Sequence, residues 1–318
     1  MNKRRQFLAA GLALGAAPGF AQSGRVIRIV VPFGAGGVQD ILARSISIEL
    51  GSALNANVIV ENRAGAGGTI GTGLVAKAAP DGNTMILAAA SHNINGSLYA
   101  KLAYDPQKDF TPMAHIGSAG YVLMIHPDVP ARTAAEFIRY ARANPGKMNY
   151  ATAGVGSATH LSMAYFCGLA AIDMVHVPLK ATGEAINEVL SGRAQAVIAA
   201  SIGALPFVKD ARIRLLGVTT AKRSKYLPEV AAIAESGLPG YEFDSWFGLL
   251  GPAGVPRAEV ERVNAAVGQL LKSPAVLERL DKQGIDPQAL SPDEFARLLR
   301  GDFERMAKVV KISGAKAE

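Results

Sequence analysis

Residues 26–40 read V-I-R-I-V-V-P-F-G-A-G-G-V-Q-D, an apolar run that leads through a glycine-rich loop. The β-branched residues at 26–31 favour a strand, and the apolar spacing that begins at Val38 predicts a helix. A strand, a glycine loop and a helix in this order can direct backbone N–H groups at a small anion. The question is therefore which anion this loop holds.

The rest of the chain alternates in the same way between apolar runs and helical patterns. Most of the runs are continuous, as in parallel strands that are covered by helices on both faces. The pattern therefore predicts an α/β fold. We expect strands at 26–31, 57–61, 84–90, 112–117, 121–126, 148–152, 173–178, 195–200, 214–219 and 246–252.

Helix signals fall between and after these strands. Thr133-Ala134-Ala135-Glu136 predicts a capping box that opens a helix ending at Ala143. After Pro252 the sequence predicts three consecutive helices, two of which open with Ser-Pro. No internal repeat is evident in the letters of the sequence.

Two of the predicted strands are each followed by a new series of elements. A chain that leaves one lobe near residue 124 and returns near 245 forms two lobes that are joined by two strands. We expect residues 26–124 and 245–318 in lobe 1 and residues 125–244 in lobe 2. Each lobe should be a mostly parallel sheet flanked by helices, with a cleft and a hinge between the lobes.

The first 21 residues predict a signal peptide, with a basic head, an apolar stretch at 7–17 and cleavage after Ala21. Arg4-Arg5 resembles a twin-arginine export signal, and the alternative is a general secretory signal. Removing this segment leaves 30 basic and 26 acidic residues, evenly spread, which argues against a nucleic-acid partner. We expect a soluble, exported, periplasmic protein. Cys167 is the only cysteine, so no intramolecular disulfide can form.

The glycine loop does not match the nucleotide-binding patterns. Gly37-Val38-Gln39 lacks the lysine and the hydroxyl of a phosphate-binding Walker loop. A dinucleotide fingerprint would need glycine where Gln39 stands, and in the second glycine cluster where Ile70 stands. Backbone N–H groups at a helix start remain, and they suit a carboxylate as well as a phosphate. A tight turn without a ligand is the alternative.

A further loop, at 153–160, repeats this layout between a strand and a helix. It reads A-G-V-G-S-A-T-H and adds the hydroxyls of Ser157 and Thr159. If the lobes form as predicted, this loop and the loop at 33–40 face each other across the cleft. We therefore expect a ligand whose carboxylate groups are held by both lobes.

The sequence offers little for catalysis. Ser157 does not stand in a Gly-x-Ser-x-Gly elbow, and a triad with His160 would need an acid that the sequence does not reveal. The five histidines show no metal-ligand spacing. Asp40 is expected in the first helical turn, where it would order the loop. We predict no enzyme activity, no metal and no cofactor.

Several motifs along the whole mature chain resemble the Bug-type (TctC-like) solute-binding proteins of tripartite tricarboxylate transporters. They are Pro32-Phe33 with Gly36-Gly37 and Asp40, Glu61-Asn62-Arg63-Ala64-Gly65-Ala66-Gly67-Gly68, Pro80-Asp81-Gly82, Tyr104-Asp105-Pro106, Asp109-Phe110, Pro145-Gly146-Lys147-Met148-Asn149-Tyr150, Val175-His176-Val177-Pro178, Ala221-Lys222-Arg223-Ser224, Gly237-Leu238-Pro239-Gly240-Tyr241, Ser245-Trp246-Phe247-Gly248 and Pro252-Ala253-Gly254.

The resemblance implies an extracytoplasmic binding protein with a two-lobed, type II-like periplasmic-binding fold. Such a protein closes on a small carboxylate and delivers it to a permease of one large and one small membrane subunit. We expect a monomer. The ligand-binding residues that the resemblance implies are Phe33, Gly34, Ala35, Gly36, Gly37, Asp40, Ala66, Gly67, Ser91, Gly156, Ser157, Ala158, Thr159 and His160, with Lys180, Thr182 and Ser201 added from the second lobe.

The sequence departs from the family pattern at two places. Leu179-Lys180-Ala181 stands where the family often has Tyr-Lys-Gly, and Ala200-Ser201 stands where it often has Asp-Asn. An acid at the second position could pair with an amino group. Its absence favours a di- or tricarboxylate without an amine, including an aromatic or longer aliphatic diacid. Two alternatives remain, a carboxylate-sensing module for a membrane signalling partner and a secreted serine hydrolase that uses Ser157 and His160.

Overall fold

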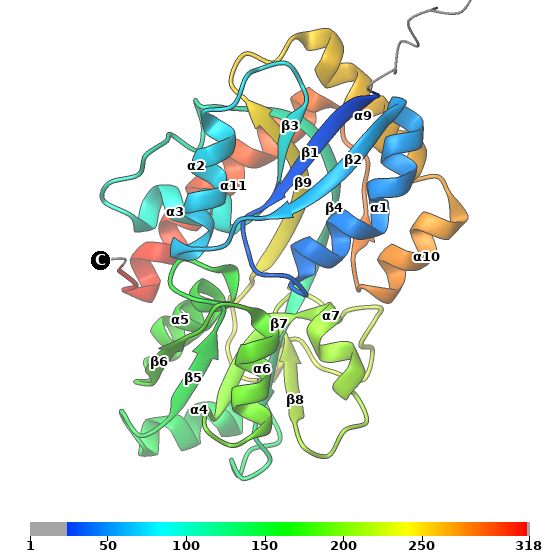
Figure 1. The fold of residues 1–318 in the computed structure, drawn as a ribbon. Coiled ribbons are helices and arrows are strands. Elements are labelled where there is room, and N and C mark those ends of the chain that lie inside the picture. Colours follow the sequence, from blue (N-terminus) through cyan, green and yellow to red (C-terminus); the bar gives the residue numbers. More distant parts are fainter. Residues whose placement is uncertain (1–23, 317–318) are drawn as a thin grey trace, which may run out of the picture.

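The computed structural model describes residues 24–316, so the predicted signal peptide lies outside the described residues. Two lobes lie one above the other, and β4 runs from the upper lobe into the lower one (Figure 1). The strands are β1 Arg25–Val31, β2 Ala56–Asn62, β3 Thr84–Ala89, β4 Phe110–Ile125, β5 Asn149–Thr152, β6 Val175–Pro178, β7 Ala196–Ala200, β8 Arg214–Val218, β9 Asp244–Pro252 and β10 Asp286–Pro287.

Helices pack on the faces of these strands. They are α1 Val38–Leu54, α2 Thr69–Ala76, α3 Ser91–Leu98, α4 Ala134–Ala143, α5 Ala158–Ala170, α6 Thr182–Leu190, α7 Ser201–Ala204, α8 Ile233–Ser236, α9 Arg257–Leu270, α10 Pro274–Lys282 and α11 Pro292–Ser313, with short 3-10 turns at Ala66–Gly68 and Leu205–Phe207. The three predicted C-terminal helices are therefore confirmed as α9, α10 and α11.

The strands follow the order β2-β1-β3-β9-β4-β7-β5-β6. The parallel prediction is confirmed for β2, β1 and β3 in the upper lobe and for β7, β5 and β6 in the lower lobe. The crossing strands differ, because β9 is antiparallel to β3 and β4 is antiparallel to β7. The fold is thus mixed α/β with two lobes, as the sequence predicted.

The strands predicted at 112–117 and 121–126 form one long strand, β4. Its residues 110–120 pair with β9, and its residues 121–125 pair with β7 and β8. Gly117 and Gly120 lie within this strand. Asp286 O approaches Gly117 so closely that a Cβ there would collide with it. Glycine therefore serves close packing here and does not end the strand.

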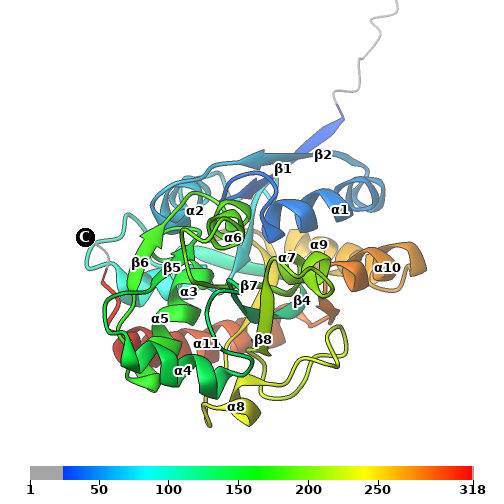
Figure 2. The same ribbon diagram turned by 90° about the horizontal axis from the view of Figure 1, so that it is seen from below.

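The last helix contacts both lobes. Its residues Met306, Val309 and Val310 join a buried apolar cluster with Leu161 and Phe166 of α5. The red end of α11 accordingly reaches the green elements in Figures 1 and 2. Each such side chain, once fully buried, contributes about 1.5–3 kcal/mol. The C-terminal helix is therefore a third link between the lobes, which the sequence did not predict.

The helices α11 and α4 begin with capping interactions near the residues that the sequence indicated. Ser291 and Glu294 form a reciprocal capping box at the start of α11. At α4 the Thr133 hydroxyl accepts from Glu136 N–H, but the Glu136 carboxylate accepts from Arg132 N–H at 2.7 Å. The hydroxyl half of the predicted capping box is therefore present. The carboxylate half differs, because Glu136 bonds to the N–H of Arg132 and not to that of Thr133.

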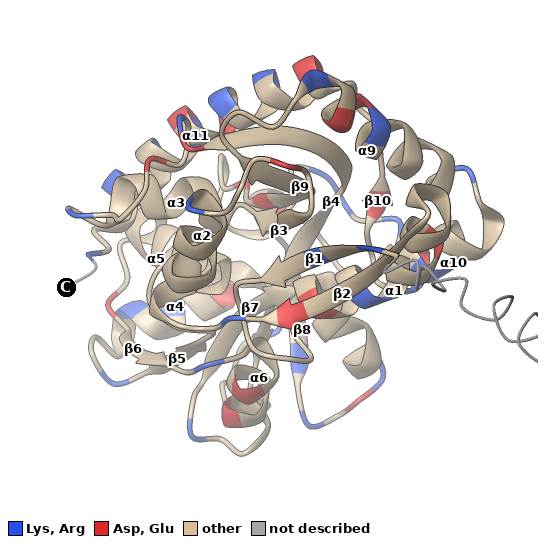
Figure 3. Ribbon diagram, turned by 45° about the horizontal axis from the view of Figure 1, so that its top comes forward, with Lys and Arg blue, Asp and Glu red and all other residues tan. Residues whose placement is uncertain are grey.

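Charged side chains of both signs are interspersed along the outer helices α9 and α11 (Figure 3). Pairs such as Arg257 with Glu261 on α9 and Arg305 with Asp302 on α11 illustrate the mixture. This arrangement agrees with the nearly balanced charge of residues 22–318, which hold 30 basic and 26 acidic side chains.

Candidate functional site

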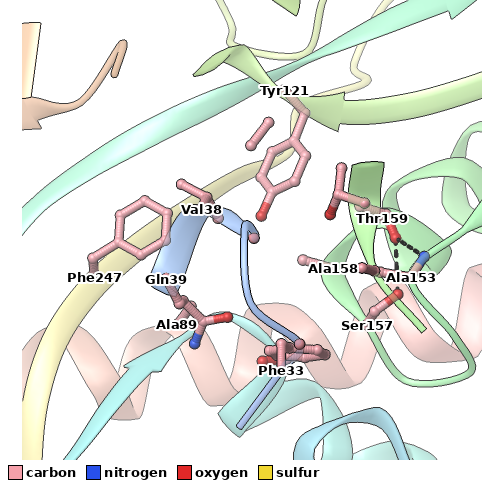
Figure 4. A pocket seen from close by; sticks show the side chains of 16 residues that line it. Phe33, Val38, Gln39, Ala89, Tyr121, Ala153, Ser157, Ala158, Thr159 and Phe247 are labelled. Atoms are coloured by element: carbon pink, nitrogen blue, oxygen red, sulfur yellow. Dashed lines mark hydrogen bonds between the residues drawn. The ribbon is translucent and has the colours of Figure 1, made fainter. Parts of the chain in front are cut away.

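A narrow cavity of about 40 Å³ lies between the lobes. Figure 4 shows Phe33 at one end and Tyr121 at the other, with Phe247 facing Thr159 across the space. Four helices, α1, α3, α5 and α6, begin at this cavity. It is lined by Phe33, Gly34, Gly37, Val38, Gln39, Ala89, Ser91, Tyr121, Ala153, Ser157, Ala158, Thr159, Ala181, Thr182, Ala200 and Phe247.

The first loop is held in shape from below by Asp40. Gly36 has a φ of +79°, which favours glycine, and its N–H donates to Asp40 Oδ2 at 2.9 Å. The other Asp40 oxygen pairs with Arg44 at 2.9 Å. Gly37 caps α1 without a side chain, and the first helical bond runs from Ile41 N–H to Gly37 O. The N–H groups of the first turn therefore have no acceptor within the helix.

The second loop repeats this geometry 120 residues later. Gly156 has a φ of +81°, and its N–H donates to His160 Nδ1 at 3.3 Å, as Gly36 N–H donates to Asp40. Ser157 caps α5 with nearly the same backbone angles as Gly37. The segments 34–40 and 154–160 thus form one structural motif twice. The likeness lies in the backbone, because the letters of the two segments agree only at two glycine positions.

Hydroxyl groups stiffen the second loop. The Ser157 hydroxyl donates to Gly154 O at 2.7 Å and accepts from His160 N–H at 3.2 Å. Thr159 Oγ1 accepts from Ala153 N–H at 2.8 Å and lies 2.9 Å from Ser157 Oγ. The two contacts of Thr159, with Ala153 and with Ser157, are the dashed lines in Figure 4. Both hydroxyls are thereby engaged within the loop itself.

No lining residue of this cavity carries a formal charge. The positive character comes from the starts of α1 and α5, each equivalent to roughly half an elementary charge. The wall beside them is largely apolar, with Val38, Tyr121 and Phe247. Such a site stabilises a carboxylate through backbone N–H groups and accommodates a hydrocarbon body.

Two histidines support the second loop from behind. His160 and His176 stack with ring centroids 4.2 Å apart, and Tyr150 stacks on His176 at 5.0 Å. Burial lowers the pKa of His160 to about 3, assisted by His176, and burial lowers the pKa of His176 to about 4. Both rings are therefore neutral near pH 7, and His160 Nδ1 can accept from Gly156 N–H.

A second cavity of about 440 Å³ adjoins the first and shares Phe33 and Ala153 with it. Its wall includes the glycine cluster that precedes α2, together with Tyr99 and Lys180. A Cβ at Gly67 would collide with Val155 O of the opposite loop. The two lobes therefore touch directly at the edge of this cavity.

The predicted site residues fall into three groups. Phe33, Gly34, Gly37, Ser91, Ser157, Ala158, Thr159 and Thr182 line the first cavity. Ala66, Gly67 and Lys180 line the second. Ala35, Gly36, Asp40, Gly156, His160 and Ser201 line neither.

The last group lies outside the cavities for identifiable reasons. Asp40 and His160 point back into their own loops, where each accepts a glycine N–H. Ala35 and Gly36 are exposed at the outer bend of the first loop. Ser201 is buried and donates to Gly120 O at 2.9 Å.

Sequence reasoning missed half of the first cavity. Val38 and Gln39 directly follow the glycine loop, so their place in the first helical turn could have been inferred. Ala153 lies in the predicted loop at 153–160, and Ala181 lies between Lys180 and Thr182. Ala89, Tyr121, Ala200 and Phe247 sit at strand ends or within strands and carry no signal that separates them from core residues.

Within residues 24–316, no cluster of three or more histidine, cysteine, aspartate or glutamate side chains is arranged to hold a metal ion. In the same range, none of the helices has the length and hydropathy needed to span a bilayer.

Residues 42–315 match the family described as "Tripartite tricarboxylate transporter family receptor". The chain belongs to this receptor family. BugT of Bordetella pertussis is 33% identical over 297 residues, which cover 92% of this chain and 90% of BugT. The chain is thus a solute-binding protein of the Bug and TctC type, a periplasmic family.

Solved structures of other members agree with the fold. The R. palustris protein Rpa4515 with adipate is 33% identical, with a TM-score of 0.87 over 92% of this chain and 98% of that one. MatC from Rhodopseudomonas palustris with bound malate is also 33% identical, with a TM-score of 0.84 over 90% of this chain and 99% of MatC. This receptor therefore shares the two-lobed architecture of proteins that hold small dicarboxylates.

Proposed function

We propose that this receptor captures a small dicarboxylate in the first cavity by hinge closure and delivers it to a tripartite tricarboxylate transporter. The observation that carries the proposal is the pair of matched loops at 34–40 and 154–160, whose helix starts converge on one uncharged cavity. A carboxylate between them would accept hydrogen bonds from both lobes at once. That shared ligand stabilises the closed state through its differential affinity for the two states.

The lining favours a plain diacid over an amino acid. Ala200 stands at the second-lobe wall, and no acidic side chain lines the cavity that could pair with an ammonium group. Val38, Tyr121 and Phe247 instead offer apolar contact to methylene groups or an aromatic ring. Adipate, bound by the relative Rpa4515, is a ligand of this kind.

Hinge closure requires strands that cross between the lobes. β4 crosses within its length, and β9 follows the return of the chain to the upper lobe. We retain the division at residues 124 and 245 as a proposal. Exchange of the ligand would then follow the rotation of one lobe against the other.

The geometry of Ser157 and His160 does not support the serine hydrolase alternative. The Ser157 hydroxyl donates to Gly154 O, and the His160 imidazole faces Gly156 N–H and His176. A nucleophilic serine would need the imidazole as its hydrogen-bond acceptor. A sensing role would use the same binding site, and dependence of solute uptake on the two membrane subunits separates transport from sensing.

Export to the periplasm belongs to the same proposal. We infer that residues 1–21 are removed, so the mature chain should begin at Gln22. Mass spectrometry of the periplasmic protein tests this directly. A chain that retains Met1 would contradict the signal-peptide assignment.

The binding proposal is tested by thermal unfolding of the periplasmic protein, refolded from denaturant to remove bound solute. Mono-, di- and tricarboxylates, aromatic acids and acidic amino acids form the panel. A ligand at 100 times its dissociation constant stabilises the protein by about 2.7 kcal/mol. We expect the largest shift with a diacid that has no amine.

A Gly37→Val variant supplies the loss-of-binding control. Gly37 has a φ of −73°, so valine is tolerated there, but its side chain would enter the first cavity. The ligand shift should disappear while the unliganded melting temperature changes little. A best ligand of aspartate or glutamate, or no response to any acid, would contradict the proposal.

A further inference from the structure

The lobes also touch at a place that lies away from both cavities. The loop at 219–230 follows β8, which pairs with the lower part of β4. This loop reaches β10, which pairs with the upper part of β4. The residues that meet there line neither cavity, and they are Lys225 and Tyr226 of the loop with Ile285 and Asp286 at the start of β10. A change at these residues therefore acts on the lobes and not on a bound solute directly.

A hydrogen bond forms the centre of this contact. The Tyr226 hydroxyl donates to Ile285 O at 2.9 Å and lies 3.3 Å from Asp286 Oδ1. The tyrosine side chain is half-buried. Burial raises the pKa of Tyr226 to about 12, so the phenol keeps its proton near pH 7 and can donate. A side chain of the lower lobe is thus bonded to the main chain of the upper lobe.

An ion pair lies beside this hydrogen bond. Lys225 Nζ is 2.6 Å from Asp286 Oδ1 and 4.8 Å from the centre of the Tyr226 ring. The side chains of Lys225 and Asp286 are 58% and 60% exposed. Water and salt therefore screen their attraction, and the ion pair should contribute less than the hydrogen bond.

Both ends of the contact are anchored in the core of their own lobe. Leu227, next to the tyrosine, is buried in the apolar cluster that contains Val122 and Met124 of the lower lobe. Ile285 is fully buried in the apolar cluster of the upper lobe. Neither main chain can follow the opposite lobe, so a rotation that separates the lobes lengthens the 2.9 Å bond. Such a bond weakens once its length exceeds about 3.2 Å.

The motif Ala221-Lys222-Arg223-Ser224 shapes the loop in front of this contact. The Arg223 guanidinium pairs with Glu235 at 3.1 Å, which ties the loop to α8. The Ser224 hydroxyl accepts from Tyr226 N–H at 3.2 Å and turns the chain. The binding site leaves this motif unexplained, whereas the contact with β10 gives it a role. It holds the next two residues in position.

We propose that Lys225 and Tyr226 form a latch with β10 that stabilises the closed arrangement of the two lobes. The same arrangement brings Gly67 against Val155 at the edge of the second cavity. The latch and the closed cleft therefore form together, and the latch adds to the preference of a bound solute for the closed state. This inference rests on the proposed function, because hinge closure is what gives the latch an effect on affinity. Both residues are positioning residues that do not touch the solute.

The first test removes the hydroxyl group and keeps the ring. Isothermal titration of refolded Tyr226→Phe uses adipate, malate and the acid that gives the largest thermal shift. We expect affinity to fall about three- to fivefold, because one hydrogen bond is lost in the closed state. The factor should be the same for every acid that binds, since the latch acts on closure. Tyr140→Phe, at a half-buried tyrosine of α4, is the matched control and should leave affinity unchanged.

A second test removes the charge of the latch. Lys225→Met should lower affinity about twofold at low salt, and this difference should disappear as the salt concentration rises. Lys222→Met makes the same change of charge three residues earlier in the loop and should have no effect. Stopped-flow measurements should show faster dissociation of the solute from both latch variants, with association nearly unchanged. A purely structural role would lower the melting temperature without changing the dissociation rate.

The outcomes distinguish the latch from the function on which it rests. Unchanged affinity in Tyr226→Phe would overturn the latch and leave carboxylate binding intact. A loss for one acid alone would overturn it as well, since that result indicates a direct contact with the acid. Higher affinity in Tyr226→Phe would show that the contact holds the lobes apart. No binding of any acid by the unchanged receptor would instead overturn the proposed function.

Discussion

The loops at 34–40 and 154–160 share one backbone shape but are supported by different chemistry. In each, a glycine at a positive φ donates its N–H to the side chain four residues later. That side chain is Asp40 in the upper lobe and His160 in the lower lobe. A carboxylate paired with Arg44 and a neutral imidazole stacked on His176 thus perform the same local task.

The two loops also differ at the residues that cap their helices. Gly37 leaves the cap of α1 without a side-chain bond, whereas Ser157 caps α5 and joins a network with Thr159. The upper loop therefore leaves more hydrogen-bond donors for a ligand. In the lower loop, side chains of the loop itself already accept some of these hydrogen bonds. This difference suggests that the ligand binds first to the upper lobe and that closure adds the lower loop.

The largest effect should come from a methyl group at Gly156. Its Cβ would lie 2.6 Å from Asn95 Oδ1, and Asn95 is anchored because its Nδ2 donates to Gly67 O. Closure would be blocked, so we expect adipate affinity to fall by about 100-fold in Gly156→Ala. Titration calorimetry measures the loss.

The equivalent Gly36→Ala variant is its matched control. Gly36 has almost the same φ, but no atom lies within 4 Å of its added Cβ. Both variants should lose about 1–2 kcal/mol of stability from left-handed strain. If Gly36→Ala loses as much affinity as Gly156→Ala, contact between the lobes does not explain the difference.

The two histidines behind the lower loop should make the stability of the protein depend on pH. The pKa of His160 is about 3 and that of His176 about 4 in the folded protein, against about 6.5 in an unfolded chain. Below pH 6.5 the unfolded chain takes up protons that the folded protein refuses. The free energy of unfolding is therefore highest above this pH and falls as the pH drops towards 4.

Replacing one imidazole should make this decline shallower. Each proton taken up on unfolding contributes a slope of about 1.4 kcal/mol per pH unit. His160→Gln keeps an acceptor for Gly156 N–H and should remove one such proton. Urea unfolding between pH 4 and 7 measures the slope, with His126→Gln, near the surface, for comparison. An unchanged slope in His160→Gln would show that His160 is protonated in the folded protein.

The support of the upper loop can be weakened without changing the size of the side chain. Asp40→Asn loses the charge that pairs with Arg44 and weakens the acceptor of Gly36 N–H. We expect about a tenfold loss of adipate affinity and a loss of roughly 1–2 kcal/mol of stability. If Arg44→Met causes the same loss of affinity, the ion pair between Asp40 and Arg44 is the important contact. If affinity is kept in Arg44→Met, the hydrogen bond from Gly36 N–H to Asp40 is the important contact.

The smallest effect should come from the cap of the lower loop. Ser157→Ala removes the acceptor of His160 N–H and should cost about 1 kcal/mol of stability. Affinity for adipate should fall only a few-fold, because the Ser157 hydroxyl is already engaged within the loop. A loss above 30-fold would mean that this hydroxyl contacts the ligand directly.

The sequence by itself determined the features that depend on neighbouring residues. The apolar runs predicted the strands, the Ser-Pro pairs opened α10 and α11, and the glycine loops at 33–40 and 154–160 identified two sides of the cavity. Backbone freedom, capping and periodicity act over a few residues, so their signals can be read along the chain.

Only the tertiary structure decided which side chains meet from distant segments. It merged two predicted strands into β4, placed α11 against both lobes, and brought Tyr121 and Phe247 to the same cavity. It also turned Asp40 and His160 away from the cavity, because each satisfies a glycine N–H of its own loop. Apolar residues of the core and of a binding wall look alike in a sequence, since burial favours both and only packing separates them.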